Sequence, residues 1–159
     1  MMNDTKTKIL QLLRTVDRPG MDAVIAYLES SNYFITTCYK HHLDPGGLAE
    51  HSYEVYTHMR ALAGDIPADS IIIAGLFHDV GKTVHRRDGF RGEHNRRSVQ
   101  LLDKLGFQLT ADERTAIGKH HGATAEDRRA CRLLALVNRG DCLSTGAWKL
   151  AHPFRRHRK

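Results

Sequence analysis

Hydrophobic residues recur at spacings of three and four along most of the chain, which is the period of an amphipathic α-helix. Residues 9–16 and 24–28 carry the first two such sets, and Pro19 and Gly20 separate them. A polar and aromatic stretch over residues 32–45 follows. Two short leading helices and a non-helical connection are therefore expected before the next helix, which the pattern predicts at about residues 48–63.

The most apolar segment of the chain predicts a buried central helix. Residues 69–80 are apolar on every side, and Gly81 stands where a C-terminal glycine cap is expected. Residues 82–92 mix Gly, Asp and Arg, which is typical of a functional loop. The remaining pattern predicts three further helices, at about residues 93–105, 111–121 and 126–145.

The pattern contains no convincing pair of strands and no repeat, so we expect one all-α domain, a helical bundle of about six to eight helices. Within it, residues 1–31 would be leading helices packed on the core, 32–148 the core itself, and 149–159 a basic tail. The formal net charge is +6, but the last eight residues hold no acid. The body is therefore nearly neutral, and a basic end of this kind is typical of a solvated terminus or of an arm that binds phosphates.

Cysteine usage and hydropathy indicate a cytoplasmic protein. Cys38, Cys131 and Cys142 show no C-x-x-C spacing and follow no signal peptide, which suits a reducing compartment. The longest apolar run, residues 71–77, is far shorter than the ~18 residues that a membrane span requires. No membrane association is expected, and the sequence does not indicate the oligomeric state.

The 11 histidines indicate metal or acid-base chemistry, because histidine is the commonest metal ligand in proteins and titrates near neutral pH. His51 shares the apolar face of its predicted helix with Leu48, Val55 and Met59, at offsets of three, four and eight. A single inward histidine is more often a hydrogen-bonded core residue than a ligand. The other polar residues at buried positions therefore decide how His51 is interpreted.

Two carboxylates also fall at inward positions. His78 and Asp79 are adjacent near the end of the most apolar helix, and Asp141 follows Leu134 and Val137 on one helical face. A buried, unpaired carboxylate costs several kcal/mol, so each needs a partner. An arginine or a helix end would serve, but a shared metal ion accounts for His51 and these three residues together.

Three further histidines fit a second metal ion. His94 opens one predicted helix, and His120 and His121 end another. Adjacent helical residues differ by about 100° in direction, so one of His120 and His121 is favoured as a ligand, and both remain candidates. Asp79 is placed to bridge two ions. The His41-His42 pair stays open, with His42 a candidate for binding the substrate.

Cations surround the proposed centre, which suggests an anionic substrate. Arginine and lysine side chains suit phosphate oxygens, although most residues of a solvated loop contact nothing. Lys82, one turn beyond the His-Asp pair, is the first candidate for substrate contact, and Arg86 and Arg91 follow it. The full set in this region is Lys82, Arg86, Arg87, Arg91, Arg96 and Arg97.

These residues resemble the HD superfamily of metal-dependent phosphohydrolases, whose pattern is a His, a His-Asp doublet and a distant Asp. The matching segments are Gly-Leu-Ala-Glu-His51, Phe-His78-Asp79-Val-Gly-Lys82 and Asn138-Arg-Gly-Asp141. With the additional histidines His94 and His120-His121, the chain resembles the binuclear branch of this superfamily. The stretch His41-His42-Leu-Asp-Pro-Gly-Gly-Leu-Ala-Glu-His51 resembles the HD module of bacterial 3′-to-5′ exoribonucleases.

The resemblance implies a phosphohydrolase or phosphodiesterase that acts on a nucleotide or short oligonucleotide through a metal-bound hydroxide. Asp79 and Lys82 would be the catalytic residues, and two divalent transition metals would be bound, iron or manganese first and nickel, cobalt or zinc next. The chain departs from two branches. It has Gly122-Ala-Thr where the cyclic-di-GMP enzymes have Gly-Tyr-Pro, and Lys82 where mononuclear nucleotidases have Glu. Two alternatives stay open: a di-iron oxygenase, and a non-catalytic module that binds nucleotide or RNA.

Overall fold

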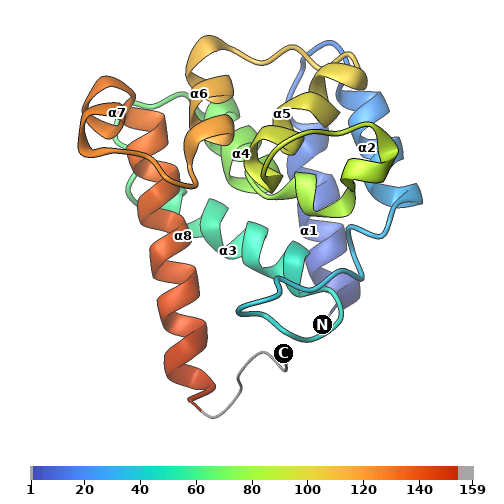
Figure 1. The fold of residues 1–159 in the computed structure, drawn as a ribbon, viewed down its shortest axis with the longest axis horizontal. Coiled ribbons are helices and arrows are strands. Elements are labelled where there is room, and N and C mark those ends of the chain that lie inside the picture. The colour runs from blue at the N-terminus through green and yellow to red at the C-terminus, as the bar shows by residue number, and fades with distance from the viewer. Residues whose placement is uncertain (1, 154–159) are drawn as a thin grey trace.

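The computed structural model describes residues 2–153 and contains only helices, turns and loops in that part of the chain (Figure 1). The prediction of an all-α bundle with six to eight helices is confirmed. In chain order the described helices are α1 (Met2–Arg14), α2 (Met21–Ser30), α3 (Gly47–Ala61), α4 (Ala68–Phe77), the 3₁₀ turns η1 (Val80–Thr83) and η2 (Arg86–Asp88), α5 (His94–Lys104), α6 (Ala111–Lys119), α7 (Ala125–Ala130) and α8 (Arg132–Ala151).

Helix α4 lies inside the bundle because its side chains are apolar on every side. Its residues 70–77 are all buried, and the helix packs against α1, α3, α6 and α8. Full burial of an aliphatic or aromatic side chain stabilises the fold by about 1.5–3 kcal/mol relative to exposure. The C-terminal end of α4, which leads into the His-Asp doublet, is thereby fixed deep in the protein.

Helix α8 is the longest of the described helices and crosses α3 (Figure 1). The contact between α3 and α8 is the most extensive one between any two described helices. Helix α8 also packs on α4, α6 and α7, while α1 covers α3 and α4. The central helix is therefore enclosed by elements from both ends of the chain. No helix of the described part combines the length and the apolarity needed to cross a bilayer.

A close backbone approach at Gly81 sets the position of α5. A Cβ atom at Gly81 would lie 2.1 Å from the carbonyl oxygen of His94, so a side chain there would push α5 away. Ser98 Oγ accepts a hydrogen bond from the Gly81 N–H (2.8 Å) and lies 2.9 Å from the carbonyl oxygen of His78, to which it can donate. The first residue of α5, His94, is thereby held beside the end of α4.

Two expectations about helix ends were wrong. Gly81 is not a left-handed C-cap, because the α-helix ends at Phe77 and the chain continues as η1 without a positive φ at Gly81. The single helix expected over residues 126–145 is two helices, because Cys131 adopts an extended conformation (φ −131°, ψ 104°). Helix α7 has no buried residue, whereas α8 has seven, so the apolar pattern of α8 does not extend back through the break.

The basic end of the chain, predicted to be a solvated terminus or a phosphate-binding arm, lies largely outside the described residues. Helix α8 continues to Ala151, beyond the predicted end at residue 145.

Candidate metal centre

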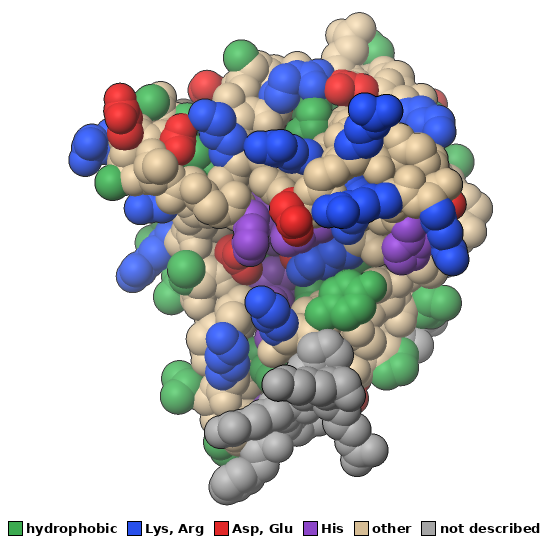
Figure 2. All heavy atoms as spheres, viewed as in Figure 1, with side chains coloured by type: hydrophobic (Ala, Val, Ile, Leu, Met, Phe, Trp, Pro, Cys, Tyr) green, Lys and Arg blue, Asp and Glu red, His purple; other side chains and the backbone are tan. Residues whose placement is uncertain are grey.

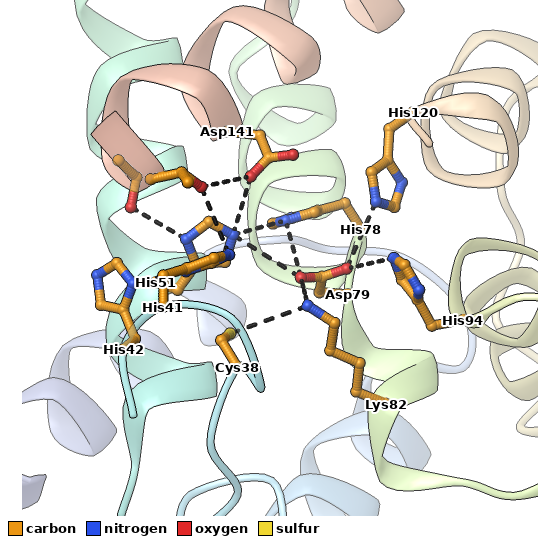
Figure 3. A network of polar contacts seen from close by, with 12 residues as sticks. Cys38, His41, His42, His51, His78, Asp79, Lys82, His94, His120 and Asp141 are labelled. Carbon is orange, nitrogen blue, oxygen red and sulfur yellow. Dashed lines mark hydrogen bonds and ion pairs between the residues drawn. The ribbon is translucent and has the colours of Figure 1, made fainter. Parts of the chain in front are cut away.

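Histidine and aspartate side chains from five segments converge beside the end of α4 (Figure 3). Helix α4 ends directly before His78, so the buried helix delivers both members of the doublet to one place. The converging residues are His51 on α3, His78 and Asp79 after α4, His94 at the start of α5, His120 at the end of α6 and Asp141 on α8.

Asp79 lies between two groups of imidazoles, and each of its carboxylate oxygens faces a different group. Oδ2 is 3.7 Å from Nε2 of His51 and 3.6 Å from Nε2 of His78. Oδ1 is 3.0 Å from Nε2 of His94 and 3.4 Å from Nε2 of His120. The carboxylate is therefore placed to bridge two donor sets.

The backbone fixes the tautomers of His78 and His120. Nδ1 of His78 lies 2.9 Å from the carbonyl oxygen of Gly75, and Nδ1 of His120 lies 2.9 Å from that of Ile117. A carbonyl oxygen only accepts hydrogen bonds, so each Nδ1 must carry the proton. In the neutral ring each Nε2 then presents a lone pair toward Asp79, as a metal-binding histidine does.

His51 is oriented by side chains instead of by the backbone. Its Nδ1 lies 3.0 Å from Ser144 Oγ, and the Ser144 hydroxyl donates a hydrogen bond of 2.6 Å to Oε2 of Glu54. Because the single hydroxyl proton goes to the carboxylate, Ser144 accepts from Nδ1 of His51. Nε2 of His51 is thus the free nitrogen, and it lies 3.2 Å from Oδ1 of Asp141.

This donor set fits metal ions. Among the described residues, Asp79 Oδ1 is a buried oxygen that makes no hydrogen bond of acceptable geometry, although two imidazole nitrogens lie close to it. Lone pairs that face a carboxylate repel it unless a cation lies between them. Donor atoms within 4.8 Å of one another form the groups His51–His78–Asp141 and His78–Asp79–His120.

The charges of the centre are strongly coupled. Burial alone would raise the pKa of Asp79, but the charge of Lys82 and the neighbouring imidazoles outweigh it and hold that pKa well below its usual range. Nζ of Lys82 lies 2.5 Å from Oδ2 of Asp79, and this carboxylate raises the pKa of Lys82 despite burial. Burial lowers the pKa of His78 to about 3, so its ring is neutral at physiological pH.

A cavity of about 290 Å³ opens onto the centre. Figure 2 shows histidine and acidic side chains in a hollow of this face, with Lys and Arg side chains around it. Besides the metal-facing residues Asp79, His94, His120 and Asp141, its walls comprise Cys38, Tyr39, Lys40, His41, Lys82, Glu93 and His121.

The structure places the predicted substrate-binding residues at different depths. Lys82 lines the cavity, whereas Arg86 and Arg91 are exposed and lie outside its lining. The guanidinium of Arg86 is 3.9 Å from Oε1 of Glu93, which does line the cavity. Of the three cations, Lys82 is therefore the one that faces the metal centre.

His42 lies behind His41 and is not part of the cavity wall. Its Nε2 is 3.0 Å from Oε2 of Glu54, and its Nδ1 is 2.8 Å from Nδ1 of His41. His41 is the member of the pair that reaches the cavity.

His120 and His121 separate as the geometry of adjacent helical residues predicts. His120 is buried and faces Asp79, whereas His121 is exposed at the cavity wall, with its ring centroid 5.2 Å from that of His94. Asn138 on α8 donates a hydrogen bond of 2.7 Å to the carbonyl oxygen of His120 and so holds this end of α6 in place.

Sequence reasoning missed Glu54 and Ser144, which orient His51. A usable signal exists, because Glu54 lies three residues after His51 and Ser144 three residues after Asp141, so that each shares a helical face with a predicted ligand. Cys38 and Lys40, which line the cavity, fall in a segment without helical periodicity, and no pattern there indicates which side chains turn inward.

Comparison with known proteins identifies the family. The family model described as HD domain matches residues 48–146, which covers more than half of the chain and all of the convergent residues described above. The chain therefore belongs to the HD domain family, whose members are generally metal-dependent phosphohydrolases. No curated protein and no solved structure matches the chain.

Proposed function

We propose that this protein is a metal-dependent phosphohydrolase that cleaves a phosphoester of a nucleotide or a short oligonucleotide with the help of two divalent transition metals. The observation that carries the proposal is the position of Asp79. Its two oxygens face separate groups of imidazoles, which is the arrangement that a carboxylate bridging paired metal ions requires.

The residues divide into two ligand sets that share Asp79. His51, His78 and Asp141 would hold one ion, and His94 and His120 would hold the other, with His121 at its outer edge. Sets rich in imidazole favour iron, manganese, cobalt, nickel or zinc over magnesium and calcium, which prefer oxygen ligands. Iron and manganese are the first choices.

The proposed reaction is hydrolysis at phosphorus. A bond forms between the oxygen of water and phosphorus, the ester P–O bond breaks, and the leaving alcohol takes up a proton. Bound ions would lower the pKa of the attacking water and neutralise charge on the phosphoryl oxygens. Lys82 supplies a further positive charge at the cavity wall, where it can contact a phosphoryl oxygen that carries growing negative charge.

The surroundings of the cavity support a substrate with a phosphate at the centre and further groups beside it. A second hollow of about 550 Å³ adjoins the cavity and shares Glu93 and His121 with it. Arg96 and Lys119 line this hollow, and Lys119 is partly neutralised by an ion pair with Asp127. Arginine favours phosphate oxygens, so a second phosphate is expected along this side.

Elemental analysis combined with an anaerobic assay tests the proposal. The purified protein should hold close to two transition metals per chain and release p-nitrophenolate from bis-p-nitrophenyl phosphate without O₂, and dinucleotides should then be tried as substrates. Metal-loaded protein that hydrolyses no phosphoester would contradict the proposal. Two irons with O₂ consumption and no hydrolysis would identify an oxygenase, and salt-dependent oligonucleotide binding without turnover would identify a binding module.

A further inference from the structure

The turn over residues 38–41 forms one wall of the cavity and is conformationally strained. Cys38 and His41 form an isolated antiparallel bridge, and Tyr39 between them has a positive φ of 48°. His42 has a φ of 46°, which is equally unusual for a residue with a side chain. Strain of this kind persists only where the surrounding structure imposes it, and it is concentrated at functional sites.

Packing against α3 imposes the conformation. A Cβ atom at Gly47 would lie 1.9 Å from the carbonyl oxygen of His42, so the first residue of α3 must be glycine for the turn to approach so closely. The Cys38 N–H donates a hydrogen bond of 3.2 Å to the same carbonyl oxygen. The result is that Cys38 and His41 are both buried and both face the cavity.

We infer that Cys38, His41 and His51 form a third metal position, which takes a thiophilic divalent ion such as Zn²⁺ in competition with the ion held by His51, His78 and Asp141. Donor atoms of these three buried residues lie within 4.8 Å of one another (Figure 3). Ligands of a tetrahedral Zn²⁺ ion lie about 3.3–3.8 Å apart, so only a small contraction is needed. The competition rests on the proposed function, because it requires His51 to belong to the catalytic set.

A hydrogen-bonded chain prepares His41 as a ligand. The carboxylate of Glu54 accepts a hydrogen bond from Nε2 of His42, so in the neutral ring Nδ1 of His42 is an acceptor. His41 then donates from its own Nδ1 to Nδ1 of His42. Nε2 of His41 is left with a lone pair, and the Glu54 carboxylate supports the opposite ring nitrogen through His42.

The thiol gives the position its selectivity. Thiolate is a donor that Zn²⁺ takes readily in protein sites, whereas manganese is not among the ions that soft thiolate ligands select. Binding replaces the S–H bond of Cys38 with a sulfur–metal bond, and the proton passes to solvent. Burial raises the pKa of the Cys38 thiol, and the positive charge of Lys82, whose Nζ lies 4.0 Å from Sγ, opposes that rise.

The two uses of His51 exclude each other. Its Nδ1 is occupied by Ser144, so Nε2 is the nitrogen available to a metal, and one lone pair binds one ion. Zn²⁺ held by Cys38 and His41 therefore withdraws His51 from the catalytic pair. The expected consequence is that excess Zn²⁺ inhibits protein that turns over with manganese.

Cobalt spectroscopy tests the third position without relying on turnover. Titration of metal-free full-length protein with Co²⁺ should produce a near-ultraviolet thiolate-to-Co²⁺ absorption. This absorption should be lost in Cys38→Ser and retained in Cys131→Ser and Cys142→Ser, which serve as matched controls. Absence of the band in the wild-type protein, or its survival in Cys38→Ser, would overturn the inference. His41→Gln, which should shift or weaken the band, provides the second variant if Cys38→Ser fails to fold.

Inhibition provides the second arm of the test. In the manganese-loaded protein, the Zn²⁺ concentration that halves hydrolysis should rise about 10-fold or more in Cys38→Ser, and it should stay unchanged in Cys131→Ser. Equal inhibition of the wild type and Cys38→Ser would contradict the competition. A cobalt band in a protein that hydrolyses nothing would support the third position while refuting the proposed function, so the two failures are distinguishable.

Discussion

Nε2 of His51 lies 3.3 Å from Nε2 of His78, although the hydrogen bonds at both Nδ1 atoms leave neither Nε2 with a proton in the neutral rings. Two lone pairs at this distance repel each other. They become favourable neighbours when a cation binds both nitrogens. The helices α3 and α4 thus hold their imidazoles in an arrangement suited to a shared ion.

Asp79→Asn tests the bridging role. The amide keeps the size of the side chain but lacks the negative charge, so the metal content should fall from close to two ions to well below one per chain, and hydrolysis should become undetectable. Inductively coupled plasma mass spectrometry measures the first and the phosphodiester assay the second. Asp103→Asn, which alters an exposed ion pair with Arg114, is the control and should retain both. A metal-replete, active Asp79→Asn protein would rule out the site.

His120 and His121 should respond differently to the same substitution. His120→Gln removes a donor that faces Asp79, so the protein should retain one tightly bound metal instead of two. His121→Gln should retain two, with any effect confined to KM, because His121 lies at the exposed wall of the cavity. Loss of one metal in His121→Gln but not in His120→Gln would reverse the assignment of the second ligand set.

Glu54→Gln and Ser144→Ala should each weaken metal binding about 10–100-fold, because they disturb the hydrogen bonds that orient His51. Competition with a chromophoric chelator measures the affinity. Thr57→Ala is a suitable control, since Thr57 lies on the same helix and its hydroxyl contacts only the backbone of Tyr53 in the described structure. Unchanged affinity in both variants would show that the backbone alone positions His51.

Lys82→Met should destabilise the metal-free protein more than the metal-loaded one. Removing one partner of a buried ion pair costs about 3–5 kcal/mol because the remaining charge is left without compensation. Lys82 and Asp79 are both largely buried, with side chains 12% and 4% exposed. A bound cation replaces the missing charge, so manganese should restore most of the free energy of unfolding measured with urea. Equal losses with and without metal would contradict this account.

The stability of the metal-free protein should pass through a maximum near pH 6.5. Burial lowers the pKa of His78 to about 3, so the unfolded chain binds more protons below pH 6.5, and stability falls as the pH drops. Burial alone would also lower the pKa of His120, but Asp79 outweighs burial and raises that pKa in the folded protein. The stability that protonated His120 contributes is therefore present below pH 6.5, and it is lost as the pH rises through the pKa of His120 in the folded state.

Urea unfolding at about pH 5.5, 6.5 and 7.5 measures the two slopes, each of which approaches about 1.4 kcal/mol per pH unit for one group. Burial also lowers the pKa of His41 to about 3, so His78→Gln should reduce the slope on the acid side by about half and leave the alkaline side in place. Stability that increases from pH 6.5 to 5.5 would contradict the neutral state of His78.

Most of the helices and the convergence of the centre were predictable from the sequence, because burial imposes helical periodicity on apolar residues. The pattern places His51 and Asp141 inward, and the apolar run before His78 marks the buried helix. Periodicity gives no information where it is absent. The choice between His41 and His42 is made by backbone strain and by contact with Gly47, neither of which is visible along the chain.

Helix ends were harder to predict for a related reason. The α-helical stretch before the doublet ends at Phe77, and Asp79 adopts φ −107° and ψ 3°, a departure from helical geometry that accompanies the turn into η1. The break at Cys131 carries no glycine or proline signal. Local propensity therefore indicates neither of these two helix ends.

The placement of ligands on both α3 and α8 affects the kinetic stability of the folded chain. An ion shared by His51 and Asp141 would join two points that are separated by most of the domain, so it would act as a reversible cross-link comparable to a disulfide. Unfolding would then have to release the ion before α3 and α8 separate. Withdrawal of metal by a chelator would therefore shorten the half-life of the protein toward proteolysis as well as ending its chemistry.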